Sequence, residues 1–337
     1  MNYAFLTFIL LCTNSSIVFS RSTDQDSLST GSGTLDFKIT SIRIDGEVEN
    51  PGFVDLSQLP LRTVRIKELA VDDTGRQQFK GAFLYTGYSL FDVLNTIKVK
   101  KANEKEFSPS TDLYVIIENE KRQRAVFSWG EIFYARNDSR IMLSKRVKAI
   151  NPSKLKAKWP LPTGPRLVCA DDLNNVRSVN DPSKLIVKSF AGSFPAEQPQ
   201  DMYSAEIKIV NRSQSFSVGK IGPSVEFRTY VSVGYGHGMG YKGVQTVVGY
   251  LLKDVLDSVK LDLNDSRESI AVVSAKDGYR AVFSISEIFN RDDNQDFLLV
   301  DQRESKKDGR YSLFASPDFF VDRNVKAIEK IEIVRIK

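Results

Sequence analysis

One glycine-rich segment contains the residues best suited to contact a ligand and exchange a proton with it. His237 is the only histidine in the chain, and it lies in GYGHGMG at Gly234–Gly240. Glycines let a backbone approach a ligand closely, and histidine gives or takes a proton near neutral pH. We therefore consider a ligand-contacting loop here, with Tyr235 and Tyr241 beside the histidine. The alternative is a flexible connection with an exposed His237.

A lysine follows this segment directly, and a second lysine has the same place in a similar stretch earlier in the chain. These residues are Lys242 and Lys80, each followed by a glycine. We include both lysines among the candidate ligand-binding residues. A purely structural role of the repeated lysine–glycine pair is the alternative.

The residue types present exclude several kinds of catalytic site. With one histidine, a Ser-His-Asp triad is impossible in the first part of the chain, and no serine near His237 lies in a nucleophile elbow. Zinc needs three or four ligands, mostly nitrogen or sulfur, which one histidine and two cysteines do not supply. Cys169 follows an apolar pair on an expected strand, which favours an inert, buried thiol. We expect neither catalytic residues nor metal ligands.

The chain contains an internal repeat. Half of the sixteen positions in FKGAFLYTGYSLFDVL are identical, without a gap, in YKGVQTVVGYLLKDVL. Two further matches follow in the same order, and ordered matches of this kind indicate a tandem duplication. The matching segments are Phe79–Leu94 with Tyr241–Leu256, Arg124–Phe133 with Arg280–Phe289, and Arg166–Val179 with Ser312–Val325.

These matches predict two domains and a short connection. The first copy is expected at residues 35–190 and the second at 203–337. Between them, residues 191–202 include GSFPAEQPQ, which has the composition of a linker.

The N-terminal residues predict export. An uncharged apolar run lies at Ala4–Leu11, and Ser20 is a small residue where a signal peptidase would cut. Residues 1–20 are thus predicted to be a general, non-twin-arginine signal peptide, followed by a disordered spacer at 21–34. Lipidation at Cys12 and a short membrane anchor are the alternatives. We expect a periplasmic or secreted protein whose mature part has no membrane span.

The composition is that of an ordinary globular protein. The 47 basic and 42 acidic residues leave a formal charge of +5. No basic stripe is interleaved with aromatic residues, so nucleic acid is not an expected partner.

Local patterns predict many strands and a few short helices. Alternation predicts strands at Phe37–Ile44 and Thr63–Leu69, and the apolar spacing of Ser89–Ile97 predicts a helix. Glu131 and Glu287 are expected in the first turn of a short helix in each copy, where the helix dipole favours an acid. We expect an α+β fold with mixed or antiparallel sheets and short helices.

The order of the motifs resembles that of a known family. IDGEVENPGFVDLSQLP is followed by KGAFLYTGYSLFDVL, RAVFSWGEIF and GPRLVCADD. This series is similar to the oxidoreductase molybdopterin-binding domain family. The resemblance implies two tandem sulfite oxidase-like domains, with a degraded opening motif in the second copy.

The resemblance also implies a cofactor that this chain lacks the residues to hold. Family members bind molybdenum through a pterin and one cysteine thiolate, a soft ligand, just after the strand that matches Val64–Leu69. Neither Lys67–Ala70 nor Thr229–Ser232 of the second copy contains a cysteine. Enzymes of this class also acquire their cofactor before export, which a general signal peptide does not permit. We expect two degenerate copies without a cofactor.

Three functions remain open at this point. The first is an exported, non-catalytic binding or interaction protein that takes an unidentified small ligand or an envelope protein as its partner. The alternative is a molybdopterin-dependent oxidoreductase with atypical cofactor ligation. The third is a hydrolase or other enzyme centred on the His237 loop.

Overall fold

The computed structural model describes most of the chain beyond the predicted signal peptide. The described residues are 33–337 except 73, 153, 155–157, 193, 195–198, 200 and 304–308. The predicted signal peptide and nearly all of the predicted spacer therefore lie outside the described residues, as do parts of the predicted linker.

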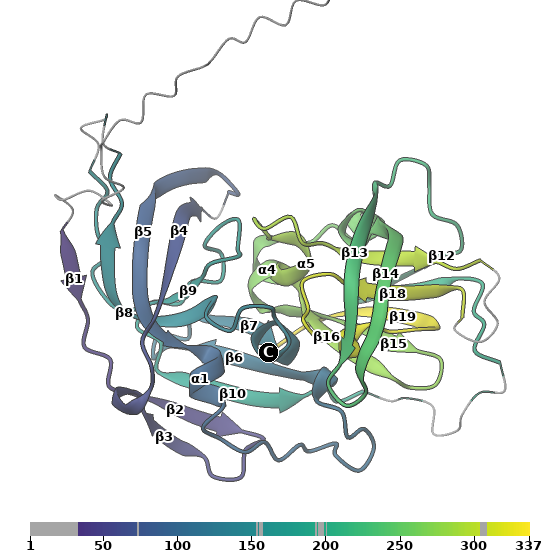
Figure 1. The fold of residues 1–337 in the computed structure, drawn as a ribbon, viewed down its shortest axis with the longest axis horizontal. Coiled ribbons are helices and arrows are strands. Elements are labelled where there is room, and N and C mark those ends of the chain that lie inside the picture. The colour runs from purple at the N-terminus through teal and green to yellow at the C-terminus, as the bar shows by residue number, and fades with distance from the viewer. Residues whose placement is uncertain are drawn as a thin grey trace, which may run out of the picture.

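The protein is mostly β, so the expected α+β fold is wrong. Strands make up 47% of the chain and helical residues 13%, and four small sheets form a propeller-like ring (Figure 1). The two expected α+β sulfite oxidase-like domains are therefore not what the chain forms. The expectation failed because the helices are single turns that join one strand to the next, and they build no layer of their own.

In the described part of the first half there are ten strands and two short α-helices. In chain order its elements are β1 (Thr34–Asp36), β2 (Ser41–Gly46), β3 (Gly52–Asp55), η1 (Leu56–Gln58), β4 (Arg62–Val71), β5 (Gln77–Ser89), α1 (Leu90–Leu94), η2 (Ser110–Asp112), β6 (Leu113–Glu118), β7 (Arg124–Ser128), α2 (Trp129–Phe133), β8 (Ile141–Ala149), β9 (Leu167–Cys169) and β10 (Lys184–Ser189).

The described residues of the second half form nine further strands. Its elements are β11 (Ile207–Asn211), β12 (Gln214–Val218), β13 (Phe227–Gly236), β14 (Gly240–Leu251), α3 (Leu252–Val255), η3 (Asp257–Val259), α4 (Leu263–Glu268), β15 (Ser269–Ala275), β16 (Arg280–Ser284), α5 (Ile285–Phe289), β17 (Phe297–Asp301), β18 (Tyr311–Ala315), η4 (Val321–Arg323) and β19 (Ile328–Arg335).

The two halves have one strand order. The sheet β3-β2-β10-β6-β7 corresponds strand for strand to β12-β11-β19-β15-β16, and each contains one parallel pair, β2 with β10 or β11 with β19. The sheet β4-β5-β8, with β9 beyond β8, corresponds to β13-β14-β17-β18. This shared order is what a duplication would produce, while the domain boundaries stay a prediction.

Each half encloses a core between its two sheets, and a third apolar cluster joins the halves. In β6, Val115 and Ile117 belong to the first core, whereas Tyr114 and Ile116 contact the second half. Val272 of β15 lies in the same joining cluster. Both faces of β6 and β15 are therefore buried, which explains why these strands are continuous apolar runs without alternation.

A buried arginine of the first half reaches across the junction. Arg177 binds its own half through Asp172 at 2.6 Å and Glu131 at 2.8 Å. One of its Nη atoms also donates to the hydroxyl of Ser284 in the second half at 3.1 Å. The guanidinium is 3% exposed, so these partners replace water.

The second half repeats the arrangement in the opposite direction. Arg323 binds Asp318 at 2.6 Å and Glu287 at 3.0 Å within its own half. It donates to the hydroxyl of Ser128 in the first half at 2.9 Å. Two equivalent arginines therefore cross the junction, and Figure 1 shows the halves meeting there, with β7 close to α4.

One repeated motif provides the partners on both sides. Ser128 and Ser284 are the N-caps of α2 and α5, and Glu131 and Glu287 complete their capping boxes. The expectation that these glutamates lie in the first turn of a short helix is confirmed. Each motif thus gives its glutamate to the arginine of its own half and its serine to the arginine of the other half.

The close approach of Arg323 requires a glycine in the first half. A Cβ atom on Gly130 would lie 2.3 Å from Nε of Arg323, well inside contact distance. The equivalent residue of the second half is Ser286, whose hydroxyl donates to the Ser266 carbonyl at 2.8 Å. The two sides of the junction are therefore similar but not interchangeable.

Removing one junction arginine should unfold the protein more easily. Arg323→Met leaves Glu287 and Asp318 buried without a counter-charge, so we expect a loss of about 3–5 kcal/mol in the free energy of unfolding. Urea unfolding followed by tryptophan fluorescence measures this loss. The measurement is made at pH 8, above the pKa of about 6 to which burial raises Asp318.

Arg65→Met is the matched control, because Arg65 is exposed on β4. Its substitution should change the free energy of unfolding by no more than about 0.5 kcal/mol. Equal effects of the two variants would contradict the importance of the crossed arginines.

Candidate functional site

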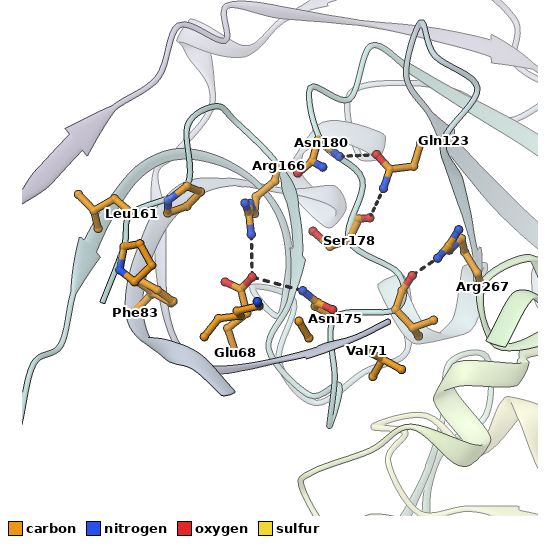
Figure 2. Close-up of a pocket in the computed structure, with 15 residues that line it drawn as sticks. Glu68, Val71, Phe83, Gln123, Leu161, Arg166, Asn175, Ser178, Asn180 and Arg267 are labelled. Atoms are coloured by element: carbon orange, nitrogen blue, oxygen red, sulfur yellow. Dashed lines mark hydrogen bonds and ion pairs between the residues drawn. The ribbon is translucent and has the colours of Figure 1, made fainter. Parts of the chain in front are cut away.

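A cavity of about 420 Å³ lies in the first half. Its walls come from the end of β4, from β5, and from the segments on either side of β9 (Figure 2). Small-molecule sites commonly have volumes of about 300–1,000 Å³, so the cavity has the size of a ligand site. Its charged lining residues are Glu68, Lys80, Arg166 and Arg267.

An ion pair between Glu68 and Arg166 forms part of the cavity wall. One Glu68 oxygen accepts from Nη1 of Arg166 at 2.7 Å and from the Asn175 amide at 3.3 Å. The other oxygen accepts from the Tyr85 hydroxyl at 2.9 Å. Burial, aided by the charge of Glu68, raises the pKa of Tyr85, which keeps this hydroxyl a donor. Both Glu68 oxygens are therefore engaged by protein groups.

The backbone directs Glu68 into this position. The register between β4 and β5 shifts after Glu68, which is paired with Gly81. Irregularities of this kind re-aim side chains at the ends of strands. Gly81 has φ +147°, and Trp159 packs where its Cβ would lie. The Trp159 ring donates to the Ile150 carbonyl at 2.9 Å, so it closes the loop against the sheet.

One nitrogen of Arg166 has no hydrogen-bond partner. Its Nε is buried, and within the described part of the chain nothing accepts its hydrogen. Buried polar atoms in proteins nearly always have partners. The Nε is therefore an unsatisfied buried donor beside the cavity.

The second half completes the cavity wall. Arg267, on α4, lines the cavity, and its Nε donates to the Val176 carbonyl at 3.0 Å. Val176 lies between Asn175, which binds Glu68, and Arg177, which crosses the junction. Asn175, Val176 and Arg177 thus link Glu68 in the cavity, Arg267 of the second half and the buried ion pairs of the junction.

The cavity has an excess of positive charge. Lys80, Arg166 and Arg267 line it, against the single carboxylate of Glu68. Arg166 neutralises that carboxylate at 2.7 Å. The charges of the other two cations are therefore left for a ligand.

The second half has different residues at the equivalent positions. Strand register and repeat alignment match Glu68 with Gly234, Arg166 with Ser312 and Asn175 with Val321. Of the charged groups that line the first cavity, Lys80 is repeated as Lys242, whereas Glu68, Arg166 and Asn175 have counterparts without charge or amide groups.

Aromatic rings pack at the corresponding place of the second half. The Tyr235 ring lies 5.9 Å from that of Phe319, and His237 lies edge-on to Phe320 at 5.2 Å between ring centroids. The polar site is thus a property of the first half.

The residues proposed from the sequence lie in two separate places. Lys80 lines the cavity. Tyr235, His237, Tyr241 and Lys242 lie on the β13–β14 hairpin of the second half, where His237 begins the turn. The backbone amide of His237 donates to Asp322 at 2.9 Å. The structure therefore does not bring Lys80 together with the other four residues.

The thiolate chemistry implied by the family resemblance does not fit this cavity. No cysteine in the described part of the chain lines it, and Cys169 lies at the end of β9 beside a smaller, adjoining cavity that shares Glu68, Arg166 and Asn175 with it. Burial, reinforced by the charge of Asp172, raises the pKa of the Cys169 thiol well above its usual value. Among the described residues, no three His, Cys, Asp or Glu side chains are arranged to hold a metal ion.

The sequence interpretation missed Glu68, Arg166, Asn175 and Arg267. In the sequence, the segment around Glu68 stands out only because it lacks a cysteine, and Arg166 only because it begins a repeated segment. A usable signal was present, because Arg166 and Asn175 are charged or amide residues that the second copy replaces by Ser312 and Val321. Arg267 joins the site only through the packing of the two halves.

Compared with models of known protein families, the chain matches none, and no curated protein is significantly similar to it. The resemblance stated from the sequence therefore stays a prediction. Across the residues that the structure describes, every helix is too short or too polar to cross a membrane.

The Cys169 thiol should react slowly in the folded protein. Because its pKa is raised, little thiolate is present at pH 8, and the thiolate is the reactive form. We expect alkylation by iodoacetamide to be at least about tenfold slower than in urea. Mass spectrometry of the Cys169 peptide measures the rate, and equal rates in the two states would contradict the assignment.

Proposed function

We propose that the chain is an exported, non-catalytic binding protein that holds a small anionic ligand in the cavity of its first half. The observation that carries this proposal is the difference between the halves. The junction residues recur in both, whereas Glu68, Arg166 and Asn175 have counterparts without charge or amide groups. A fold needs its supporting residues in each copy, so polar residues kept in one copy point to a function there.

The charge of the cavity supports an anion. Lys80 and Arg267 have no carboxylate partner among the described residues, and Nε of Arg166 has a free N–H group. Arginine forms paired, charge-assisted hydrogen bonds with carboxylate and phosphate groups. A carboxylate- or phosphate-bearing molecule would satisfy all three cations.

The polar groups of the cavity support binding rather than catalysis. Both oxygens of Glu68 accept hydrogen bonds from protein groups, so its lone pairs are poorly placed for proton abstraction. The Ser178 hydroxyl donates to the Leu167 carbonyl at 3.0 Å. Neither residue is paired as nucleophile and base, the arrangement that covalent catalysis uses.

The exported location of this binding protein rests on the N-terminal sequence. Residues 1–20 have the pattern of a general signal peptide. A periplasmic or secreted protein with an anion-binding cavity fits a role in capturing a small solute or in presenting it to an envelope partner.

Calorimetric titration at low salt tests the proposal. The probes are inorganic phosphate, sulfate, citrate, succinate and a hexose phosphate. At a hundred times its dissociation constant, a bound anion should stabilise the protein by about 2.7 kcal/mol and raise the melting temperature by several degrees. If no probe binds to the wild-type protein, the anion-binding function is wrong.

Two variants test whether the anion binds in the cavity. Lys80→Gln should weaken the best probe about tenfold, because one charge-assisted hydrogen bond is removed. The double variant Glu68→Gln with Arg166→Gln removes both charges of the pair together, so neither is left unpaired, and should weaken binding by at least as much. Lys242→Gln is the matched control, since Lys242 is the equivalent exposed lysine of the second half. If Lys242→Gln weakens binding as much as Lys80→Gln does, the anion does not bind in the cavity.

A further inference from the structure

The β13–β14 hairpin exposes an unusual amount of apolar surface. More than half of the exposed large apolar side chains of the described residues lie on this hairpin. Five of them form what we name the apolar hairpin face: Phe227 (66% exposed), Val231 (72%), Val233 (59%), Val244 (64%) and Val248 (52%).

Strand register places these five side chains on one side of the hairpin. Val233 is paired with Val244, and residues paired directly across two strands point to the same face. Alternate residues along a strand also share a face. By the same rule, Tyr250 lies on this side, and it packs against the core of the second half. One side of the hairpin is therefore apolar along its length. Near Tyr250 this side packs against the core of the second half, and toward the turn it is exposed as the apolar hairpin face.

The equivalent hairpin of the first half is charged at two of these positions. Tyr85 and Val247 are equivalent in the repeat, and their partners on the neighbouring strand are Val64 and Tyr230. Counting onward along the strands, Arg65 and Lys67 of β4 therefore correspond to Val231 and Val233 of β13.

Charged residues on outer strands prevent unwanted association. β4 and β13 are both the outermost strands of their sheets. The first half has Arg65 and Lys67 on its outer strand, and Lys67 is also paired with Asp292 of the second half at 2.6 Å. The second half has valines at both positions, so its outer strand lacks these charges.

We propose that the apolar hairpin face packs against the same face of a second copy of this chain, forming a two-fold dimer. The area suits this partner. The apolar hairpin face, with Tyr235, Met239 and Tyr241 beside the turn, exposes a total surface on the order of 1,000 Å². A typical monomer exposes a patch of about 300–600 Å², and a standard interface buries about 800 Å² on each partner.

Arg228 is bound by Glu226 at 3.1 Å and by Asp296, and it alternates with Phe227 along β13, so it points away from the apolar hairpin face. The exposed charge at the turn end of the hairpin is Lys242. Two identical apolar faces related by a two-fold axis are self-complementary in chemistry, and closed two-fold dimers are the commonest oligomers. Two stacked sheets of this kind pack about 10 Å apart. This inference is independent of the anion-binding cavity.

Sedimentation velocity of the full chain tests the dimer. At about 100 μM, well above the micromolar dissociation constants of weak specific complexes, the wild-type protein should sediment with twice the mass of one chain. The double variant Val231→Arg with Val233→Lys introduces the residues that the first half already has, and it should sediment as a monomer. The control Phe53→Lys changes an equally exposed apolar side chain of the first half, 72% exposed on β3, and should remain dimeric.

Three outcomes would overturn the proposal. These are a monomeric wild-type protein, a double variant that stays dimeric, and a control that dissociates as readily as the double variant. A monomeric wild-type protein that sediments with phosphatidylcholine vesicles would assign the face to a lipid surface instead.

Hydrogen exchange of the wild-type protein tests the dimer without any variant, and it applies even if the double variant does not fold. Amides of β13 and β14 should become at least about fivefold better protected between 1 and 100 μM protein, as a self-associating surface requires. Unchanged protection across this range would also overturn the dimer.

Discussion

Two buried arginines that cross between the halves are the interaction on which the rest of the structure depends. Arg177 and Arg323 each bind two carboxylates of their own half and one serine of the other. A buried charge is tolerated because its partners are fixed around it, and removal of any one partner leaves the others without compensation. The halves therefore cannot separate without exposing or unpairing several charges at once, and the apolar cluster between β6 and β15 adds to this constraint.

The junction between the halves fixes the positions of residues that line the cavity. Asn175, Val176 and Arg177 follow one another in the chain, and they bind Glu68, Arg267 and the junction carboxylates respectively. Because Arg267 belongs to the second half, any change in the angle between the halves would move one cation of the cavity relative to the other two. A ligand that touches all three cations would therefore report on, and stabilise, the arrangement of the whole chain.

The sequence was sufficient for many local elements but not for the class of fold. The strand near Thr63–Leu69 followed from alternation, and the short helices at Glu131 and Glu287 followed from the acids expected in their first turns, because these signals are local. The long strand β5 was missed, since Gln77–Ser89 contains two glycines and lacks clear alternation. Without that strand the helices seemed a larger part of the fold than the single turns observed.

The site was harder to predict than the elements, for a physical reason. Glu68 enters the cavity through a register shift, Arg166 approaches from a segment almost a hundred residues away, and Arg267 arrives only when the halves pack. Lys80 was proposed and does line the cavity, but the four candidates on the second hairpin do not meet it. Long-range juxtapositions of this kind leave no periodic trace in a sequence.

The glycine beside Arg323 has a consequence for the history of the chain. If the two copies once met as identical subunits, each would have placed its arginine against the same residue of its twin. Today Gly130 leaves room for Arg323, while Arg177 crosses to the second-half motif that has Ser286 at this position. A side chain added at position 130 would therefore disturb one of the two crossings and leave the other unchanged.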